Sequence, residues 1–158
     1  RFKKGEPLLF SSIKEKPQAF IRYVRDVVKR RMPEGEEVVL SDPQLIIDYA
    51  KAIGGRFPEG EAVLADNTWY AVGYAEAIGE RFPEGEEAIA ATPASVLQYA
   101  KIIKGRFPAG EKLDMFRENP WYALEYAKAI GERFPEGEAA IMSDENIAAE
   151  YKAFLANL

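Results

Sequence analysis

The chain has 158 residues, of which 47% are hydrophobic and 30% charged, a composition typical of a folded protein and not of a disordered one. It contains no cysteine and no histidine, which excludes a disulfide framework, a thiolate nucleophile and a Cys-based zinc or iron–sulfur site. The commonest general base and the commonest transition-metal ligand are also missing. We therefore expect no metal and no cofactor.

The net charge of −5 is unevenly distributed along the chain. Residues 1–31 hold ten Lys or Arg against three Asp or Glu, whereas residues 32–158 hold eleven against twenty-three. The chain is therefore basic at its head and acidic along its body. No apolar run reaches the roughly 18 residues that span a bilayer, and the N-terminus lacks the apolar core of a signal peptide. We expect a cytoplasmic protein without membrane contact.

The phrase Arg-Phe-Pro-Glu-Gly-Glu, or a close variant, recurs along the chain. Its copies begin at Arg31, Arg56, Arg81, Arg106 and Arg133, so the steps between them are 25, 25, 25 and 27 residues. A period of this length is typical of stacked repeats. We divide this single repeat domain, residues 1–158, into an N-terminal cap (1–30), four units (31–55, 56–80, 81–105 and 106–132) and a C-terminal cap (133–158).

Counting the two caps, the chain has six units, and the N-terminal cap is the first. This first unit is a degenerate copy of the later ones. Its Pro17 precedes Tyr23 by six residues, as Pro43 precedes Tyr49 in the second unit. The first and last units of a stack are atypical because each covers an open end of the core.

Three basic residues of the first unit are candidates for contact with phosphate or with an acidic partner. Arg22, Arg25 and Lys29 follow one another at spacings of three and four, which share one face of an α-helix. Three uses remain open for them: phosphate contact, head-to-tail stacking on the acidic end of another copy, which would give oligomers, and a solvated cap.

Each later unit is predicted to hold two helices. The proline of the phrase starts a short helix, because its fixed φ suits the first helical position and the nearby acidic side chains suit the helix dipole. An N-cap then opens a second helix, and about eleven residues later a glycine favours a left-handed C-terminal cap. The N-caps are Asp42, Asn67, Thr92, Asn119 and Asp144, and the glycines are Gly54, Gly79, Gly105 and Gly131. We predict an all-α fold, an α-solenoid of about six helix-turn-helix repeats of about 25 residues, each a short helix plus a three-turn helix.

Aromatic residues at fixed repeat positions are predicted to form the core. The long helices carry apolar residues four, seven, eight and eleven positions after the N-cap, a stripe about 100° wide. The seventh position is always tyrosine, and the phenylalanine of the phrase is expected to pack inward as a staple before the short helix. These residues are Tyr49, Tyr74, Tyr99, Tyr126 and Tyr151, with Phe57, Phe82, Phe107 and Phe134.

The second glutamate of the phrase forms a regular acidic row: Glu36, Glu61, Glu86, Glu111 and Glu138. We expect these carboxylates to offset the helix dipole and to pair with the arginines of the phrase. The alternative is an acidic ridge that imitates a nucleic-acid backbone and fills the basic groove of another protein. The carboxylates obey the repeat, whereas a catalytic site should break it, so we predict no catalytic residue and no enzyme.

Two tryptophans depart from the repeat. Trp69 and Trp121 lie two residues after their N-caps, almost opposite the apolar stripe, and Tyr70 and Tyr122 follow them directly. Tryptophan and tyrosine are enriched among residues that dominate binding to protein partners. Helices packed 8–10 Å apart would place the two pairs about 20 Å apart on one face. We predict that they anchor a partner, and the alternative is packing against a neighbouring loop. A third departure is the two-residue insertion around 115–118.

The repeated phrase, together with the Asp/Asn-Pro helices that carry Tyr-Ala, resembles tandem α-helical repeats encoded by tailed bacteriophages. The layout is also similar to HEAT-like and leucine-rich-repeat-variant solenoids, without the cysteine cluster of some of the latter. The resemblance covers nearly the whole chain. It implies an accessory protein in the host cytoplasm that inhibits a host or defence factor, and it carries over no catalytic residue.

We therefore expect a non-enzymatic scaffold that binds a protein partner. Nucleic-acid interference, either by mimicry through the acidic body or by phosphate contact through the basic first unit, is the alternative. A structural role in a phage particle is a further alternative.

Overall fold

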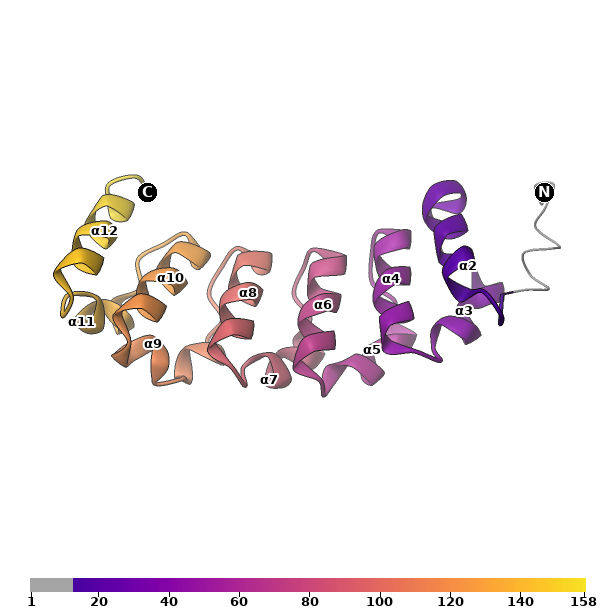
Figure 1. Cartoon of the computed structure of the whole chain (residues 1–158), viewed down its shortest axis with the longest axis horizontal. Coiled ribbons are helices and arrows are strands. Elements are labelled where there is room, and N and C mark those ends of the chain that lie inside the picture. The colour runs from indigo at the N-terminus through magenta and orange to yellow at the C-terminus, as the bar shows by residue number, and fades with distance from the viewer. Residues whose placement is uncertain (1–12) are drawn as a thin grey trace.

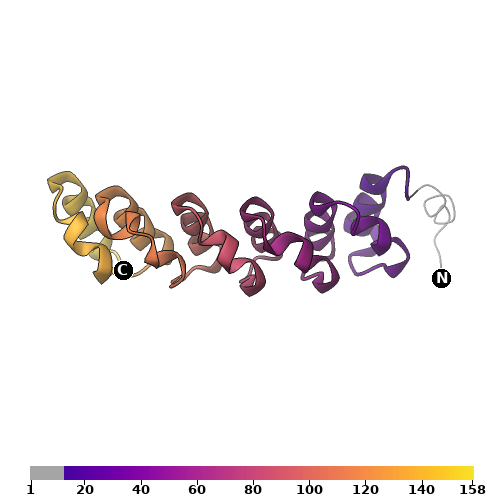
Figure 2. The same ribbon diagram turned by 90° about the horizontal axis from the view of Figure 1, so that it is seen from below.

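The computed structural model describes residues 13–158, and the start of the predicted first unit, residues 1–12, lies outside the described residues. The regular elements of the described part are all helical and follow one another along a curved rod (Figure 1). The long helices stand side by side, and the short helices line the outer edge of the bend (Figure 1). Seen from below, the row is nearly straight and the short helices lie in front (Figure 2). The predicted all-α solenoid is confirmed.

The long helices have the same length and pack against one another in chain order. Each of the later ones spans 11 residues and packs against the long helix before it and, except for the last, the one after it. In chain order they are α4 (Pro43–Ile53), α6 (Thr68–Ile78), α8 (Pro93–Ile103), α10 (Pro120–Ile130) and α12 (Glu145–Leu155). The first unit has instead α2 (Pro17–Tyr23), which continues directly into a π-helical turn, η1 (Val24–Val28).

Four of the short helices begin at the proline of the phrase, as predicted. Two are α-helical from the start, whereas two open with a tighter 3₁₀ turn. They are α3 (Pro33–Val39), α5 (Pro58–Ala65), η2 (Pro83–Gly85) with α7 (Glu86–Ile89), and η4 (Pro135–Gly137) with α11 (Glu138–Ile141).

The short helix of the fifth unit is split in two. A 3₁₀ turn, η3 (Gly110–Lys112), is followed by Leu113 in an extended conformation and then by α9 (Met115–Glu118). The break accommodates the two extra residues of this unit, which a single continuous helix of the usual length would not.

The predicted N-caps hold the long helices at their start. Each cap side chain accepts a backbone N–H bond from the first turn, as Asp42 does from Gln44 at 2.7 Å. At the other end Gly54, Gly79 and Gly131 have φ near +70°. The prediction for Gly105 is wrong, because Lys104 takes the left-handed conformation in that unit, with φ 50°. The left-handed residue lies twelve positions after the N-cap in all four units, and Gly105 comes one position later.

The core is a continuous row of aromatic rings from neighbouring units. All the predicted core tyrosines and phenylalanines are fully buried. Tyr74 packs edge-on against Phe82 of the next unit, with ring centroids 4.9 Å apart, and the same geometry recurs along the rod. In the first unit Tyr23 is only half-buried, and Phe20 stacks on Tyr49 instead at 6.0 Å. The aromatic core therefore joins the units to one another.

The glycine of the repeated phrase lets each short helix touch the long helix before it. A Cβ on Gly60 would lie 2.5 Å from a methyl carbon of Ile46, and one on Gly110 would lie 2.5 Å from Val96. Both separations are far below van der Waals contact. Gly35, Gly85 and Gly137 are equally confined, so glycine is required at this position in every unit.

Candidate partner-binding face

Each later unit repeats one polar cluster on the same side of the rod. In the third unit Tyr74 Oη donates to Glu61 Oε1 (2.8 Å) and accepts from the buried backbone N–H of Phe57 (2.6 Å). Arg56 donates to both oxygens of Glu61, at 2.7 and 2.6 Å. The same Tyr–Glu–Arg cluster is formed by Arg31 with Glu36 and Tyr49, Arg81 with Glu86 and Tyr99, Arg106 with Glu111 and Tyr126, and Arg133 with Glu138 and Tyr151.

Three of the arginines also bridge to the next unit. Arg31 reaches Glu59 at 2.8 Å, and the equivalent pairs are Arg56 with Glu84 (2.9 Å) and Arg106 with Glu136 (2.8 Å). The matching carboxylate for Arg81 would be at position 109, where the chain has alanine. The junction between the fourth and fifth units therefore lacks this bridge.

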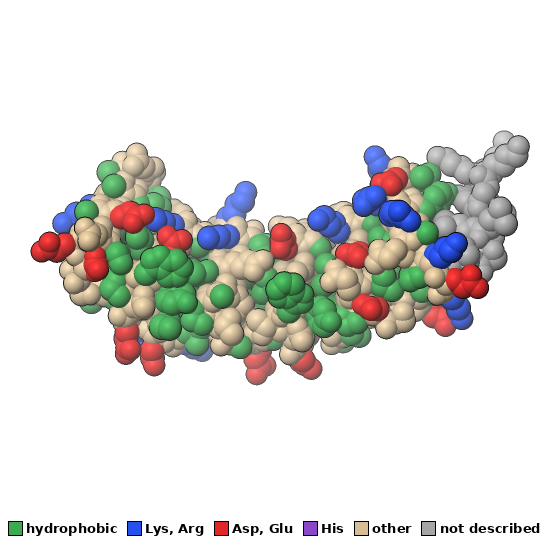
Figure 3. Space-filling model, in the orientation of Figure 1, with side chains coloured by type: hydrophobic (Ala, Val, Ile, Leu, Met, Phe, Trp, Pro, Cys, Tyr) green, Lys and Arg blue, Asp and Glu red, His purple; other side chains and the backbone are tan. Residues whose placement is uncertain are grey.

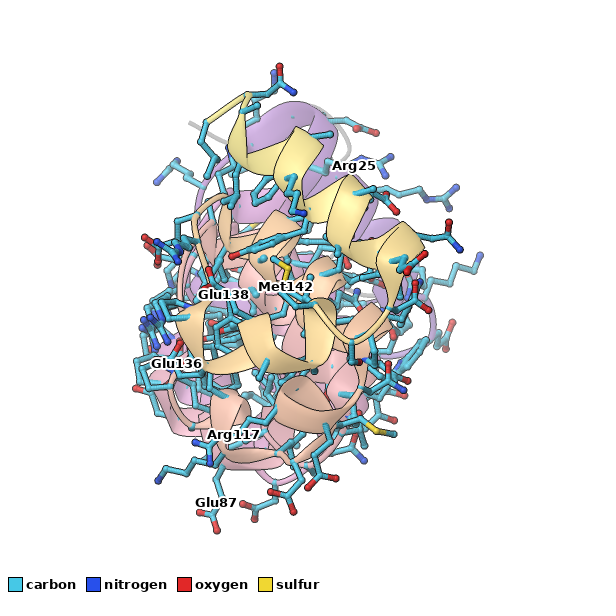
Figure 4. All side chains as sticks on the ribbon, turned by 90° about the vertical axis from the view of Figure 1, so that its left-hand side faces the viewer. Arg25, Glu87, Arg117, Glu136, Glu138 and Met142 are labelled. Carbon is cyan, nitrogen blue, oxygen red and sulfur yellow. The ribbon has the colours of Figure 1, made fainter. Side chains whose placement is uncertain are left out.

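The acidic row is not an exposed ridge, so the mimicry alternative loses its structural basis at these residues. The five glutamate side chains are only 9–22% exposed, and each carboxylate is shared by an arginine and a tyrosine hydroxyl. Figure 4, seen from the C-terminal end, places Glu136 and Glu138 on the side of the rod that is hidden in Figure 3. The expected pairing with arginine is confirmed.

Stability should fall on both sides of neutral pH because of these clusters. Hydrogen bonds from arginine lower the pKa of Glu36, Glu61 and Glu138, so their contribution is complete above about pH 4.5 and is lost as the pH falls through the lower folded values. Burial raises the pKa of Tyr74 and Tyr126, so their contribution is complete below about pH 10 and is lost as the pH rises further.

We expect the melting temperature, followed by circular dichroism at a series of pH values, to be level between about pH 6 and 9 and to drop on either side. The variant Glu61→Gln should melt lower at neutral pH and show a shallower acid drop than the parent chain. An unchanged melting temperature at about pH 3 would contradict this assignment.

The basic residues of the first unit are spread over an α-helix, a π-helical turn and its end. Arg22 lies in α2, Arg25 lies in η1, and Lys29 ends η1 in the left-handed conformation with φ 54°. A π-helical turn holds more residues than an α-helical turn, so the α-helical spacing on which the prediction rested is changed here, and the shared face stays a prediction. Arg25, labelled in Figure 4, also forms an ion pair with Asp26 at 2.8 Å.

The two tryptophans hold the same position in α6 and α10, two residues after the N-cap. Trp69 is 78% exposed and Trp121 is 53% exposed. Figure 3 shows hydrophobic side chains gathered over α6 and over α10 on the side of the rod that faces the viewer. Tyr70 and Tyr122 are half-buried and pack on the core. Tyr122 supports Trp121 edge-on, with ring centroids 4.9 Å apart. The tryptophans are therefore presented to solvent, and the tyrosines beneath them belong mainly to the scaffold.

A shallow hollow of about 550 Å³ lies beside Trp69 and runs over α4, α6 and α8. Gly73 lines it one helical turn after Trp69, where a Cβ would meet only Ile47, at 3.4 Å. Glycine in a helix interior costs about 1 kcal/mol relative to alanine. The repeat places larger polar residues at this position, Asp48 in α4 and Gln98 in α8, so the missing side chain opens the wall of the hollow. A glycine inside a predicted helix was the sequence signal for it.

Comparison with known proteins gives no information about this face. No protein-family model matches the chain, and neither a curated protein nor a solved structure matches it significantly. Across residues 13–158, no helix is both long and apolar enough to cross a bilayer. The same residues contain no group of three acidic side chains arranged to hold a metal ion.

Proposed function

We propose that this chain is a non-enzymatic repeat scaffold that binds a protein partner through the face that carries Trp69 and Trp121. The observation that supports the proposal is the exposure of both indole rings at the same position of two long helices in a row of packed helices. Large apolar side chains left in water favour burial against another surface. Tryptophan is also among the residues that contribute most when such a surface forms.

The scaffold suits this role because it is rigid beneath the two rings. Trp69 and Trp121 lie in the first turns of α6 and α10, whose N-caps Asn67 and Asn119 accept backbone hydrogen bonds from Tyr70, and from Trp121 and Tyr122. A surface already held in its binding conformation loses little conformational freedom on association. The resemblance to phage-encoded repeats extends the proposal to a host or defence factor as the partner.

The double variant Trp69→Ala, Trp121→Ala tests the proposal. The immobilised parent chain would be used to capture a partner from host lysate, and mass spectrometry would identify it. We expect the double variant to bind that partner at least about 100-fold more weakly, because a binding hot spot typically contributes 2 kcal/mol or more. Its melting temperature should change little, since both rings are exposed.

Met142→Ala is the matched control, because Met142 is also an exposed apolar side chain but lies at the C-terminal end of the rod (Figure 4). It should bind the partner as the parent does. Undiminished binding by the double variant would refute the proposal, and a large fall in its melting temperature would assign the tryptophans to the core.

A further inference from the structure

Two carboxylates beside Trp69 differ from the paired glutamates of the Tyr–Glu–Arg clusters. Asp48 in α4 accepts hydrogen bonds from the side-chain amides of Gln18 (3.2 Å) and Gln44 (3.0 Å). Glu76 in α6 accepts one from the amide of Gln98 (3.3 Å). Within the described part of the chain neither carboxylate forms an ion pair, so both have spare lone pairs for further donors.

The surroundings of the second tryptophan are different. In the helix of Trp121, the position that Gly73 occupies in α6 is Glu125, and the position of Glu76 is Lys128. Lys128 Nζ donates to Glu125 at 3.0 Å and to Glu150 of the last unit at 2.6 Å. The carboxylates near Trp121 are therefore tied up in ion pairs with a lysine of the chain itself, whereas those near Trp69 form no ion pair within the described residues.

We propose that the hollow beside Trp69 receives the guanidinium group of an arginine carried by an extended basic segment of the partner. This inference rests on the proposed function and specifies the chemistry of the partner. An indole face attracts a cation, and a planar guanidinium both stacks on an aromatic ring and presents several N–H donors. Gly73 follows Trp69 by one helical turn and lines the same hollow as the two carboxylates, which would accept those donors.

Charge complementarity selects this occupant over a purely apolar one. Asp48 and Glu76 line the hollow together with one cation, Lys51, so the lining is negative by one charge. The body of the chain, residues 32–158, carries twelve more acidic than basic residues and attracts basic segments over a longer range. The positive charge of Lys51 should weaken binding of the arginine. Removing Lys51 should therefore raise the affinity, and removing the carboxylates should lower it.

The test uses Trp121→Phe as the parent, because Trp69 is then the only tryptophan and its fluorescence reports on the hollow. A capped tetra-arginine peptide is titrated at about 0.01 M salt, where charges act over about 30 Å. We expect a saturable change in fluorescence with tetra-arginine and none with tetra-glutamate. In this background, Asp48→Asn with Glu76→Gln should weaken binding about tenfold or more, and Lys51→Ala should tighten it about threefold.

Two further variants separate this site from general attraction to an acidic protein. Glu37→Gln with Glu87→Gln removes the same amount of charge from exposed residues of the short helices, and should change the affinity by less than about twofold. Gly73→Leu fills the hollow with a better helix former, so it should fold well and lose binding.

The proposal is overturned if tetra-arginine gives no saturable signal, if the control pair weakens binding as much as the change at Asp48 and Glu76, or if Gly73→Leu binds normally. Each of these results leaves the proposed function intact as long as the double tryptophan variant still loses the captured partner. Failure of that capture experiment alone, with tetra-arginine bound as expected, would instead refute the wider proposal.

Discussion

Replacing Phe82 with alanine should lower the free energy of unfolding by about 3–5 kcal/mol, the largest loss that we expect from one change in this chain. Phe82 is fully buried, and its ring packs edge-on against Tyr74 of the preceding unit. Each unit of a solenoid contacts only its neighbours. A cavity in the middle of the rod therefore weakens the only connection between the units on either side.

Urea unfolding followed by circular dichroism measures this loss as a shift of the midpoint. Phe134→Ala is the matched control, since Phe134 is equally buried and its ring lies 4.9 Å from that of Tyr126, but it belongs to the last unit. Its loss should loosen only α11 and α12 and appear as a separate early transition. Equal single transitions for the two variants would show that the rod unfolds as one block.

Removing the carboxylate of Glu111 should cost about 3 kcal/mol, the second largest effect that we expect. Tyr126 Oη donates to Glu111 at 2.6 Å, and Arg106 donates to its two oxygens at 2.9 and 2.6 Å. Glu111→Ala leaves the buried hydroxyl hydrogen without an acceptor. It also leaves Glu136, in the next unit, as the carboxylate that still pairs with Arg106. An unsatisfied buried polar group typically costs about 1–3 kcal/mol.

Glu111→Gln keeps an acceptor for the hydroxyl and should recover part of the loss in the same urea experiment. Glu138→Ala removes the carboxylate of the corresponding cluster in the last unit, where Arg133 is largely exposed, and should cost clearly less. A loss at position 138 equal to that at position 111 would argue that burial does not govern the strength of these clusters.

The features that the sequence predicted correctly depend on local chemistry or on the repeat. The caps at Asp42 and Gly54 and the buried positions of Tyr74 and Phe82 follow from short-range patterns that recur in each unit. The left-handed turn at Lys104 was missed because the glycine nearby suggested a better candidate. The π-helical turn at Val24–Val28 has no comparable sequence signal, so the sequence did not predict it.

The candidate site was predicted only in part. The exposure of Trp69 followed from its position opposite the apolar stripe, which is a property of one helix. The hollow beside it combines side chains of three helices. Its carboxylate Asp48 accepts amide hydrogen bonds, whereas Lys128, in another unit, forms an ion pair with Glu125. Such pairings depend on distances between units, which a linear pattern does not contain.

The regular spacing of the helices fixes the distance between the two exposed tryptophans. Trp69 and Trp121 are separated by two steps of the array, about 20 Å for helices packed 8–10 Å apart. An extended segment advances about 3.3 Å per residue, so side chains about six residues apart would reach both rings at once. When the partner has bound one tryptophan, its second contact forms within the same complex. The partner is then held at a high effective concentration near the second tryptophan, which strengthens the overall binding. A partner whose two contacts are spaced differently loses this gain, even if each contact alone fits well.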